Sequence, residues 1–264
     1  MLNNITLGQY FPGDSPLHRM DPRMKLIVSI IFTAALYMAG GLRAYALIAA
    51  ADVALILMSG IPFRIIMRAI RPIMYLIIFT TTINVFWITG ETPLFSWWVV
   101  NIYPEGLTFA LMMVLRIASL IIAASLFISY TTSPTALTDA MERLLKPLAV
   151  IKLPVHEFSL IMTITLRFIP ALIEETEKIM NAQTARGANF YTGSIIKRAK
   201  ALVPVLIPLI ISAFRRAFEL ATAMECRCYS GGKGRTKMKV LHLGWIDLAA
   251  LILAGAFMAG VALL

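Results

Sequence analysis

The stretch LTFALMMVLRIASLIIAASLFISY, residues 107–130, contains one charged residue, Arg116. A helix needs about 20 mostly apolar residues to cross the hydrocarbon core of a bilayer. Four further stretches come close to this requirement: Leu26–Gly40, Ala44–Gly60, Ile73–Gly90 and Trp245–Leu264. The sequence therefore predicts an all-α membrane protein with about five transmembrane helices.

The composition of the whole chain agrees with this prediction. Hydrophobic residues make up 59% of the 264 residues and charged residues 14%, whereas soluble domains carry about 25% charged residues. The net charge is +10, but nucleic-acid binding also needs an accessible basic face on a polar domain. The first 25 residues contain no apolar segment typical of a secretory signal peptide. We expect a multi-pass protein of the cell membrane that binds no nucleic acid.

The distribution of basic residues predicts the orientation in the bilayer. With the N-terminal segment 1–25 in the cytoplasm, 22 of the 24 Lys and Arg residues fall on the cytoplasmic side, and Arg43 alone lies outside. Cytoplasmic loops are enriched in Lys and Arg. The sequence thus predicts four transmembrane helices in 26–130, a cytoplasmic segment 131–243, a final transmembrane helix in 244–264 and an outer C-terminus.

The predicted outer loop Glu91–Gly106 is rich in aromatic residues, with Trp97, Trp98 and Tyr103. Such side chains favour the membrane–water interface. We interpret the loop as an interfacial anchor, and the alternative is a contact with an external substrate.

Two charged residues, Asp52 and Arg116, fall inside predicted transmembrane helices. Burying a charge in the bilayer is costly, so such residues are candidates for a function. One interpretation is a structural pairing with each other or with a polar residue such as Asn84. The other is a direct role in transport.

The cytoplasmic segment is predicted to contain three amphipathic helices. They cover Pro134–Val150, His156–Ala185 with a bend at Pro170, and Ser194–Cys226. The apolar centre of the third helix, Ala201–Phe214, has 14 residues, which is fewer than a membrane-spanning helix needs. Large exposed apolar faces mark interaction surfaces, so we expect the chain to work as a subunit of a larger assembly.

The second and third helices are predicted to end alike, each with an arginine between two small residues. The two ends are Ala185-Arg186-Gly187 and Cys226-Arg227-Cys228, with the arginines 41 positions apart. Arginine offers a planar set of donors for carboxylates or carbonyl groups. The sequence therefore predicts two docking tips, and the alternative is a simple stabilisation of helix C-termini by cations.

The sequence contains none of the enzyme or metal-site motifs that we considered. Cys226 and Cys228 lack the spacing and the further ligands of a zinc site, so we expect them to be small packing residues. The stretch Tyr229–Arg235 is not a phosphate-binding loop, because no G-x-x-x-x-G-K-[ST] pattern exists. No H-E-x-x-H or G-x-S-x-G motif is present. We expect a non-catalytic chain that binds no metal or cofactor itself.

Several motifs resemble the transmembrane T component of energy-coupling factor (ECF) transporters. The N-terminal one is Ser15-Pro16-Leu17-His18-Arg19-Met20-Asp21-Pro22-Arg23-Met24-Lys25-Leu26. Later ones are Thr131–Pro134 with Leu144–Leu148, Arg167–Pro170 and Ala182–Gly187. Together they extend over essentially the whole chain.

The resemblance implies an ATP-driven importer in which this chain links two ABC-type ATPases, which bind ATP and Mg, to a membrane S component that binds a vitamin or other micronutrient. Arg186 and Arg227 would anchor one ATPase each. The family pattern has Ala-Arg-Gly at both tips, so Cys226 and Cys228 depart from it and put the packing of the second tip in doubt.

The apolar surface expected to hold the S component comprises Val203, Leu206, Ile207, Ile210 and Ile211. An alternative function is an autonomous carrier or channel that uses Asp52 and Arg116. A lipid-modifying enzyme lacks a candidate acid, base or metal cluster. Neither the transported substrate nor the sharing of the T component among several S components follows from the sequence.

Overall fold

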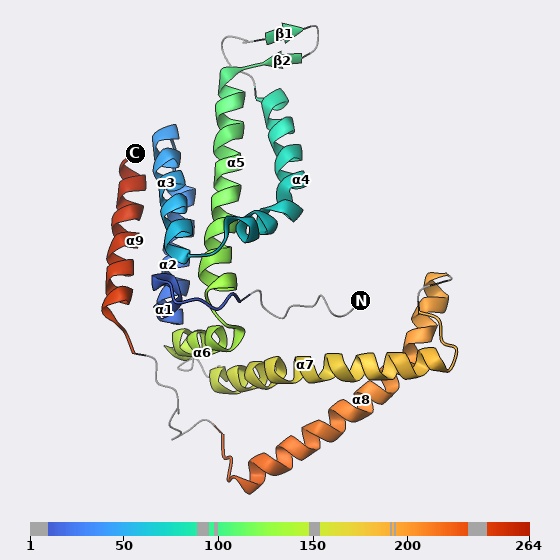
Figure 1. Ribbon diagram of the computed structural model, residues 1–264. Coiled ribbons are helices and arrows are strands. Elements are labelled where there is room, and N and C mark those ends of the chain that lie inside the picture. The colour runs from blue at the N-terminus through green and yellow to red at the C-terminus, as the bar shows by residue number, and fades with distance from the viewer. Residues whose placement is uncertain are drawn as a thin grey trace. The chain divides into compact units, whose positions relative to one another are not determined.

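The computed structural model describes residues 10–88, 95–97, 100–147, 154–190, 192, 194–231 and 242–264 (Figure 1). Contacts divide the chain into two compact units. The described part of the first, which we call the bundle unit, comprises residues 10–140 and 242–264. The described part of the second, the helix-pair unit, comprises residues 141–231.

The bundle unit consists of long helices and one short hairpin. Its elements are α1 (Pro16–Arg19), α2 (Pro22–Met38), α3 (Leu42–Ser59), α4 (Phe63–Trp87), β1 (Phe95–Trp97), β2 (Val100–Ile102), α5 (Pro104–Ala124), the π-helix η2 (Ser125–Tyr130) and α9 (Trp245–Leu263). Helix α6 (Pro134–Leu145) runs across the division between the units. The helix-pair unit contains α7 (Val155–Ala185) and α8 (Ile195–Cys226).

The five stretches predicted as transmembrane helices are largely helical, in α2, α3, α4, α5 with η2, and α9. Four of them are long and apolar enough to cross a membrane, and α2 is not among these. The expected outer loop contains the antiparallel pair β1–β2, with Phe95 opposite Ile102. This hairpin was not predicted. Trp98 and the side chain of Trp97 lie outside the described residues, so the anchor interpretation stays a prediction.

Among the described residues, six helices are long and apolar enough to cross a membrane: α3, α4, α5 with η2, α7, α8 and α9. The chain is therefore an all-α membrane protein, as the sequence predicted. The argument that α8 is too short to cross was wrong, because the run Ala201–Phe214 is the centre of a helix of 32 residues. Length alone does not assign α7 and α8 to the cytoplasm.

The core of the bundle unit lies where α2, α3, η2 and α9 meet. Leu36 and Ile48 are fully buried there, and the rings of Phe32 and Phe257 stack with centroids 5.0 Å apart. A second cluster joins the start of α4 to η2 through Ile66 and Leu126. Burial of apolar surface contributes about 25 cal/mol per Å², so these clusters hold the helices together.

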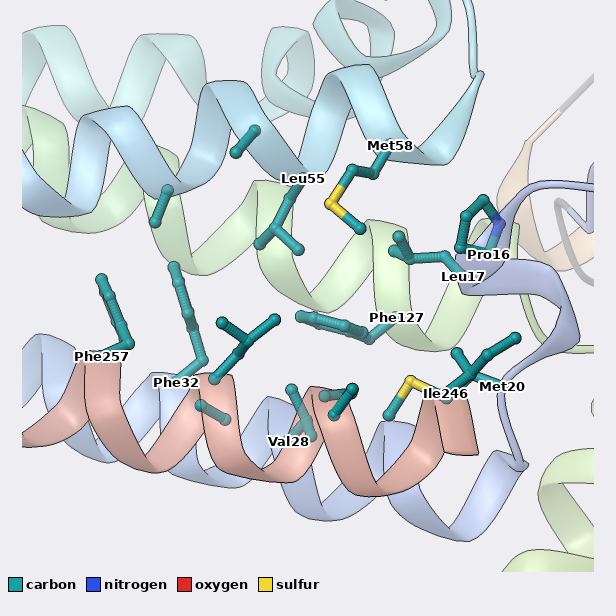
Figure 2. A pocket seen from close by; sticks show the side chains of 16 residues that line it. Pro16, Leu17, Met20, Val28, Phe32, Leu55, Met58, Phe127, Ile246 and Phe257 are labelled. Carbon is teal, nitrogen blue, oxygen red and sulfur yellow. The ribbon is translucent and has the colours of Figure 1, made fainter. Parts of the chain in front are cut away.

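An apolar cavity of about 410 Å³ lies beside this core. Figure 2 shows Val28 and Phe32 of α2, Leu55 and Met58 of α3, Phe127 of η2 and the α9 residues Ile246 and Phe257 around it. All 16 of its lining residues are apolar. The cavity therefore offers no polar group that would hold a charged or strongly hydrated substrate.

Candidate functional site

Helix α7 ends at the first of the two arginine tips. Arg186 is the C-cap, and Gly187 follows with φ +90°, in the left-handed region that glycine adopts without steric cost. The Ala188 amide donates to the Gln183 carbonyl at 3.0 Å, and the Gly187 amide donates to the Thr184 carbonyl at 2.9 Å. This pair of hydrogen bonds is a Schellman motif, which ends a helix sharply.

Helix α8 ends in the same way at the second tip. Arg227 is the C-cap, and Cys228 follows with φ +56°. The Tyr229 amide donates to the Met224 carbonyl at 3.0 Å, and the Cys228 amide donates to the Glu225 carbonyl at 2.8 Å. The departure from Ala-Arg-Gly changes the side chains of this tip but leaves its backbone geometry intact.

Both tips are open to their surroundings. The side chains of Arg186 and Arg227 are exposed, and neither forms a hydrogen bond or an ion pair within the described parts of the chain. Cys226 and Cys228 are also exposed. The two cysteines therefore do not pack into a core of this chain, and packing against another subunit stays a prediction.

An ion pair joins α7 to α8, and the position of this pair on the two helices is called the crossing below. The Arg216 guanidinium of α8 donates to the Glu175 carboxylate of α7, and both side chains are partly buried. Figure 1 shows the two helices crossing. Glu175 precedes Arg186 by 11 positions, and Arg216 precedes Arg227 by the same number. At 1.5 Å per residue, each tip lies about 16 Å along its helix from the crossing.

The two arms that lead from the crossing to the tips contain no proline. Pro170 of α7 and the pair Pro204 and Pro208 of α8 all lie on the other side of the crossing. Proline kinks a helix because it removes a backbone donor and crowds the preceding turn. The arms are therefore the stiffer parts of the two helices.

The apolar face predicted on α8 is exposed. Its residues are exposed by about half each: Val203 47%, Leu206 50%, Ile207 54%, Ile210 53% and Ile211 56%. Val205 between them is buried, at 3%. At about 100° of rotation per residue, the five residues lie on the side of the helix away from Val205, so they form one continuous apolar surface.

Helix α7 is also fixed at its start, by a residue that the sequence did not single out. Glu142 accepts a hydrogen bond from the Ser159 hydroxyl at 2.8 Å, and its second oxygen lies 3.3 Å from Nδ1 of His156. The sequence around a carboxylate on an amphipathic helix does not indicate a partner 14 or 17 positions away. This contact is long-range in sequence, and no periodicity would have found it.

The N-terminal motif forms a clamp in the bundle unit. The Asp21 carboxylate caps α2 by accepting from the Arg23 amide at 2.9 Å, and it pairs with the Arg23 guanidinium at 2.7 Å. The Asp21 amide donates to Asp247 of α9 at 2.7 Å. The buried Lys25 ammonium donates to the Thr131 carbonyl at 2.7 Å. The motif therefore ties α2 to the start of α9 and to the end of η2.

The two intramembrane charges do not pair with each other or with Asn84. Arg116 donates to the Tyr45 hydroxyl at 2.6 Å and to the Ala39 carbonyl at 3.4 Å. Asp52 accepts a short hydrogen bond from the Ser119 hydroxyl. The interpretation as a structural pairing with polar residues is confirmed, but the named partners were wrong, because Tyr45 of α3 and Ser119 of α5 supply the partners. Neither charge lines the cavity of Figure 2.

Comparison with known proteins places these features in a family. A family model described as CbiQ, cobalt transport protein, matches residues 13–238. The energy-coupling factor transporter transmembrane protein EcfT of Ruminiclostridium cellulolyticum is 47% identical over 264 residues, or 100% of this chain and 98% of that protein. The chain belongs to this family of ECF transporter transmembrane components.

Other EcfT proteins agree over nearly the same length. The EcfT protein of Clostridium kluyveri is 48% identical over 96% of this chain and 94% of its own. That of Bacillus subtilis is 43% identical over 91% of each chain. The family confirms the resemblance, a place in transport and a multi-pass location in the membrane. The family name also implies a complex of several subunits.

Proposed function

We propose that this ECF transmembrane component is a non-catalytic lever between two ABC-type ATPase subunits, which bind ATP and Mg, and a membrane S component that binds a vitamin or other micronutrient. In this proposal Ala185, Arg186 and Gly187 dock into one ATPase, and Cys226, Arg227 and Cys228 dock into the other. The N-terminus and the two tips face the cytoplasm, and the C-terminus faces outward.

The observation that carries the proposal is the equality of the two arms. Both tips end in a Schellman motif with an exposed arginine at the C-cap, and both lie 11 positions beyond the Glu175–Arg216 crossing. Two tips with the same structure, at the same distance from the crossing, are suited to bind two similar partners. When the two ATPases approach each other, two stiff arms would transmit that motion to the crossing.

The exposed face of α8 supplies the opposite end of the lever. Val203, Leu206, Ile207, Ile210 and Ile211 lie before the crossing, whereas Arg227 lies after it. We propose that this face binds the S component, because a continuous apolar surface buries well against another membrane protein. Movement of the tips about the crossing would then tilt or displace that partner.

The proposal is tested by reversing the charges of the two tips and measuring both the assembly of the complex and the uptake of substrate. The tagged chain is co-expressed with two ATPase subunits and one S component, and the retained ATPase is quantified. The double variant R186E/R227E should lower the apparent affinity for the ATPases by more than tenfold, because removing one partner of a buried charge pair costs about 2–5 kcal/mol. ATP-driven uptake in proteoliposomes should fall with it.

The matched control is K197E/K200E, which reverses two exposed charges of the same unit away from the tips. This control should assemble and transport normally. Normal assembly and uptake in R186E/R227E would overturn the proposal, and so would an equal loss in the control. Transport by the purified chain alone would instead support an autonomous carrier or channel.

A further inference from the structure

Helix α4 begins with three arginines on one face. Arg64, Arg68 and Arg71 are spaced i, i+4 and i+7, and all three are exposed. Helix α4 contains no acidic residue. Within the described residues, none of the three guanidinium groups forms a hydrogen bond or an ion pair. Three cations are thus aligned with no internal counter-charge.

The opposite face of the same segment is fixed to the bundle unit. Ile66 is fully buried in the cluster with Leu126, and the Tyr130 hydroxyl donates to the Ile65 carbonyl at 3.3 Å. At about 100° per residue, the three arginines lie roughly 140–200° around the helix from Ile66. The docking of Ile66 therefore turns the basic face outward.

A third face of the segment is apolar and exposed. Phe63 is exposed by 62% and Met67 by 44%, and both lie between the buried face and the basic face. A helix with a basic face beside an apolar one suits the boundary between lipid headgroups and acyl chains. A soluble anion would leave this apolar flank uncovered, whereas a lipid covers both faces.

The direction of the segment agrees with such a position. Pro72 follows Arg71 directly inside α4, and a proline in a helix interior kinks it. In Figure 1 the first turns of α4 lie crosswise to α5, and the remainder of α4 runs alongside α5. If α5 crosses the bilayer, the segment Phe63–Arg71 lies close to the plane of its surface.

We propose that Phe63–Arg71 is a binding site for acidic phospholipids, with the three guanidinium groups on the phosphodiester headgroups and the flank of Phe63 and Met67 against the acyl chains. Guanidinium groups bind phosphate oxygens in a bidentate manner. Such a site would hold the kinked start of α4 at the membrane surface. It depends on the membrane location of the chain and not on the proposed coupling to ATPases.

The test uses the full chain in a mild detergent, with lipid binding followed by native mass spectrometry. Phosphatidylglycerol is the acidic probe and phosphatidylcholine the neutral one. The wild-type chain should bind phosphatidylglycerol more tightly than phosphatidylcholine. The variant R64Q/R68Q/R71Q should bind phosphatidylglycerol at least about tenfold more weakly, since each basic residue near a membrane surface contributes about a fivefold gain. Its affinity for phosphatidylcholine should not change.

Two further variants keep the proposal falsifiable. K197Q/K200Q/R215Q removes three exposed charges elsewhere and should retain most of the phosphatidylglycerol binding. R64K/R68K/R71K keeps the charge but not the bidentate geometry, and it should bind at an intermediate level. All four proteins should elute alike in gel filtration, because the substituted side chains are exposed.

The proposal is overturned if the glutamine triple variant binds phosphatidylglycerol as the wild type does. It is also overturned if R64Q/R68Q/R71Q and K197Q/K200Q/R215Q lose binding equally, since net charge alone would then explain the effect. Complete displacement of the lipid by millimolar glycerol phosphate would point to a site for a soluble phosphate. Unchanged lipid binding with a loss of co-purified ATPase would point to a protein partner.

Discussion

The buried charges of the bundle unit and the two arginine tips of the helix-pair unit differ in whether they have a partner within the chain. In the bundle unit, Lys25 and Arg116 each have a partner that lies far away in sequence. In the helix-pair unit, Arg186 and Arg227 are exposed and have no partner within the described residues. A satisfied buried group stabilises the fold that surrounds it, whereas an unpaired exposed cation is available to another subunit.

The same contrast holds for apolar surface. Leu36 and Ile48 of the bundle unit are fully buried, whereas Ile207 and Ile210 of α8 are about half exposed. The comparison teaches that the core and the clamp of the bundle unit are built for stability, whereas the tips and the exposed face of α8 are built for contact. Substitutions in that core and clamp should therefore act on unfolding, and those at the tips and on the α8 face should act mainly on function.

The largest effect on stability is expected for Lys25→Met. This change keeps the length and the packing of the side chain but removes the donor to the Thr131 carbonyl. A buried acceptor left without a donor costs about 1–3 kcal/mol, so the free energy of unfolding should fall by that amount. Thermal unfolding in detergent measures it, with the exposed Lys146→Met as the control. An unchanged midpoint would show that the clamp contributes nothing.

Most of the fold was accessible from the sequence, because it follows from patterns within one helix. The apolar stretches, the long helices after Pro154 and Ser194, and both arginine-capped ends follow from hydrophobic runs and helix-end residues. The hairpin β1–β2 was missed because its six residues are too few for a periodic signal. The kink that turns the start of α4 crosswise was also missed, because the predicted helix begins at Ile73, after Pro72.

The candidate site was accessible only in part, for a related reason. The tips are local features, and Arg186 and Arg227 were found by their neighbours in sequence. The crossing of Glu175 with Arg216 and the contact of Asp21 with Asp247 join residues 41 and 226 positions apart. Such pairs depend on tertiary packing, which a single sequence does not reveal. The sequence left the partners of Asp52 and Arg116 open for the same reason.

A smaller effect on stability is expected at the crossing of α7 and α8. Glu175→Ala or Arg216→Ala should lower the free energy of unfolding by at most about 1 kcal/mol, because the pair is partly exposed. ATP-driven uptake should fall by a larger factor if the crossing is the pivot of the lever. The charge swap E175R/R216E should recover most of the uptake. A swap that stays as defective as the single variants would contradict a role for this ion pair.

The smallest effect compares the two tips with each other. Cys228 adopts the left-handed conformation that Gly187 adopts at the other tip, and this conformation costs an L-residue about 1–2 kcal/mol. Glycine removes that strain but adds about 0.5–1 kcal/mol of backbone entropy to the unfolded chain. Cys228→Gly should therefore stabilise the protein by about 0.5 kcal/mol, and Gly187→Cys should destabilise it by a similar amount. Chemical denaturation of the two variants measures both changes. If both substitutions stabilise the protein, or both destabilise it, the tips differ in more than this one residue.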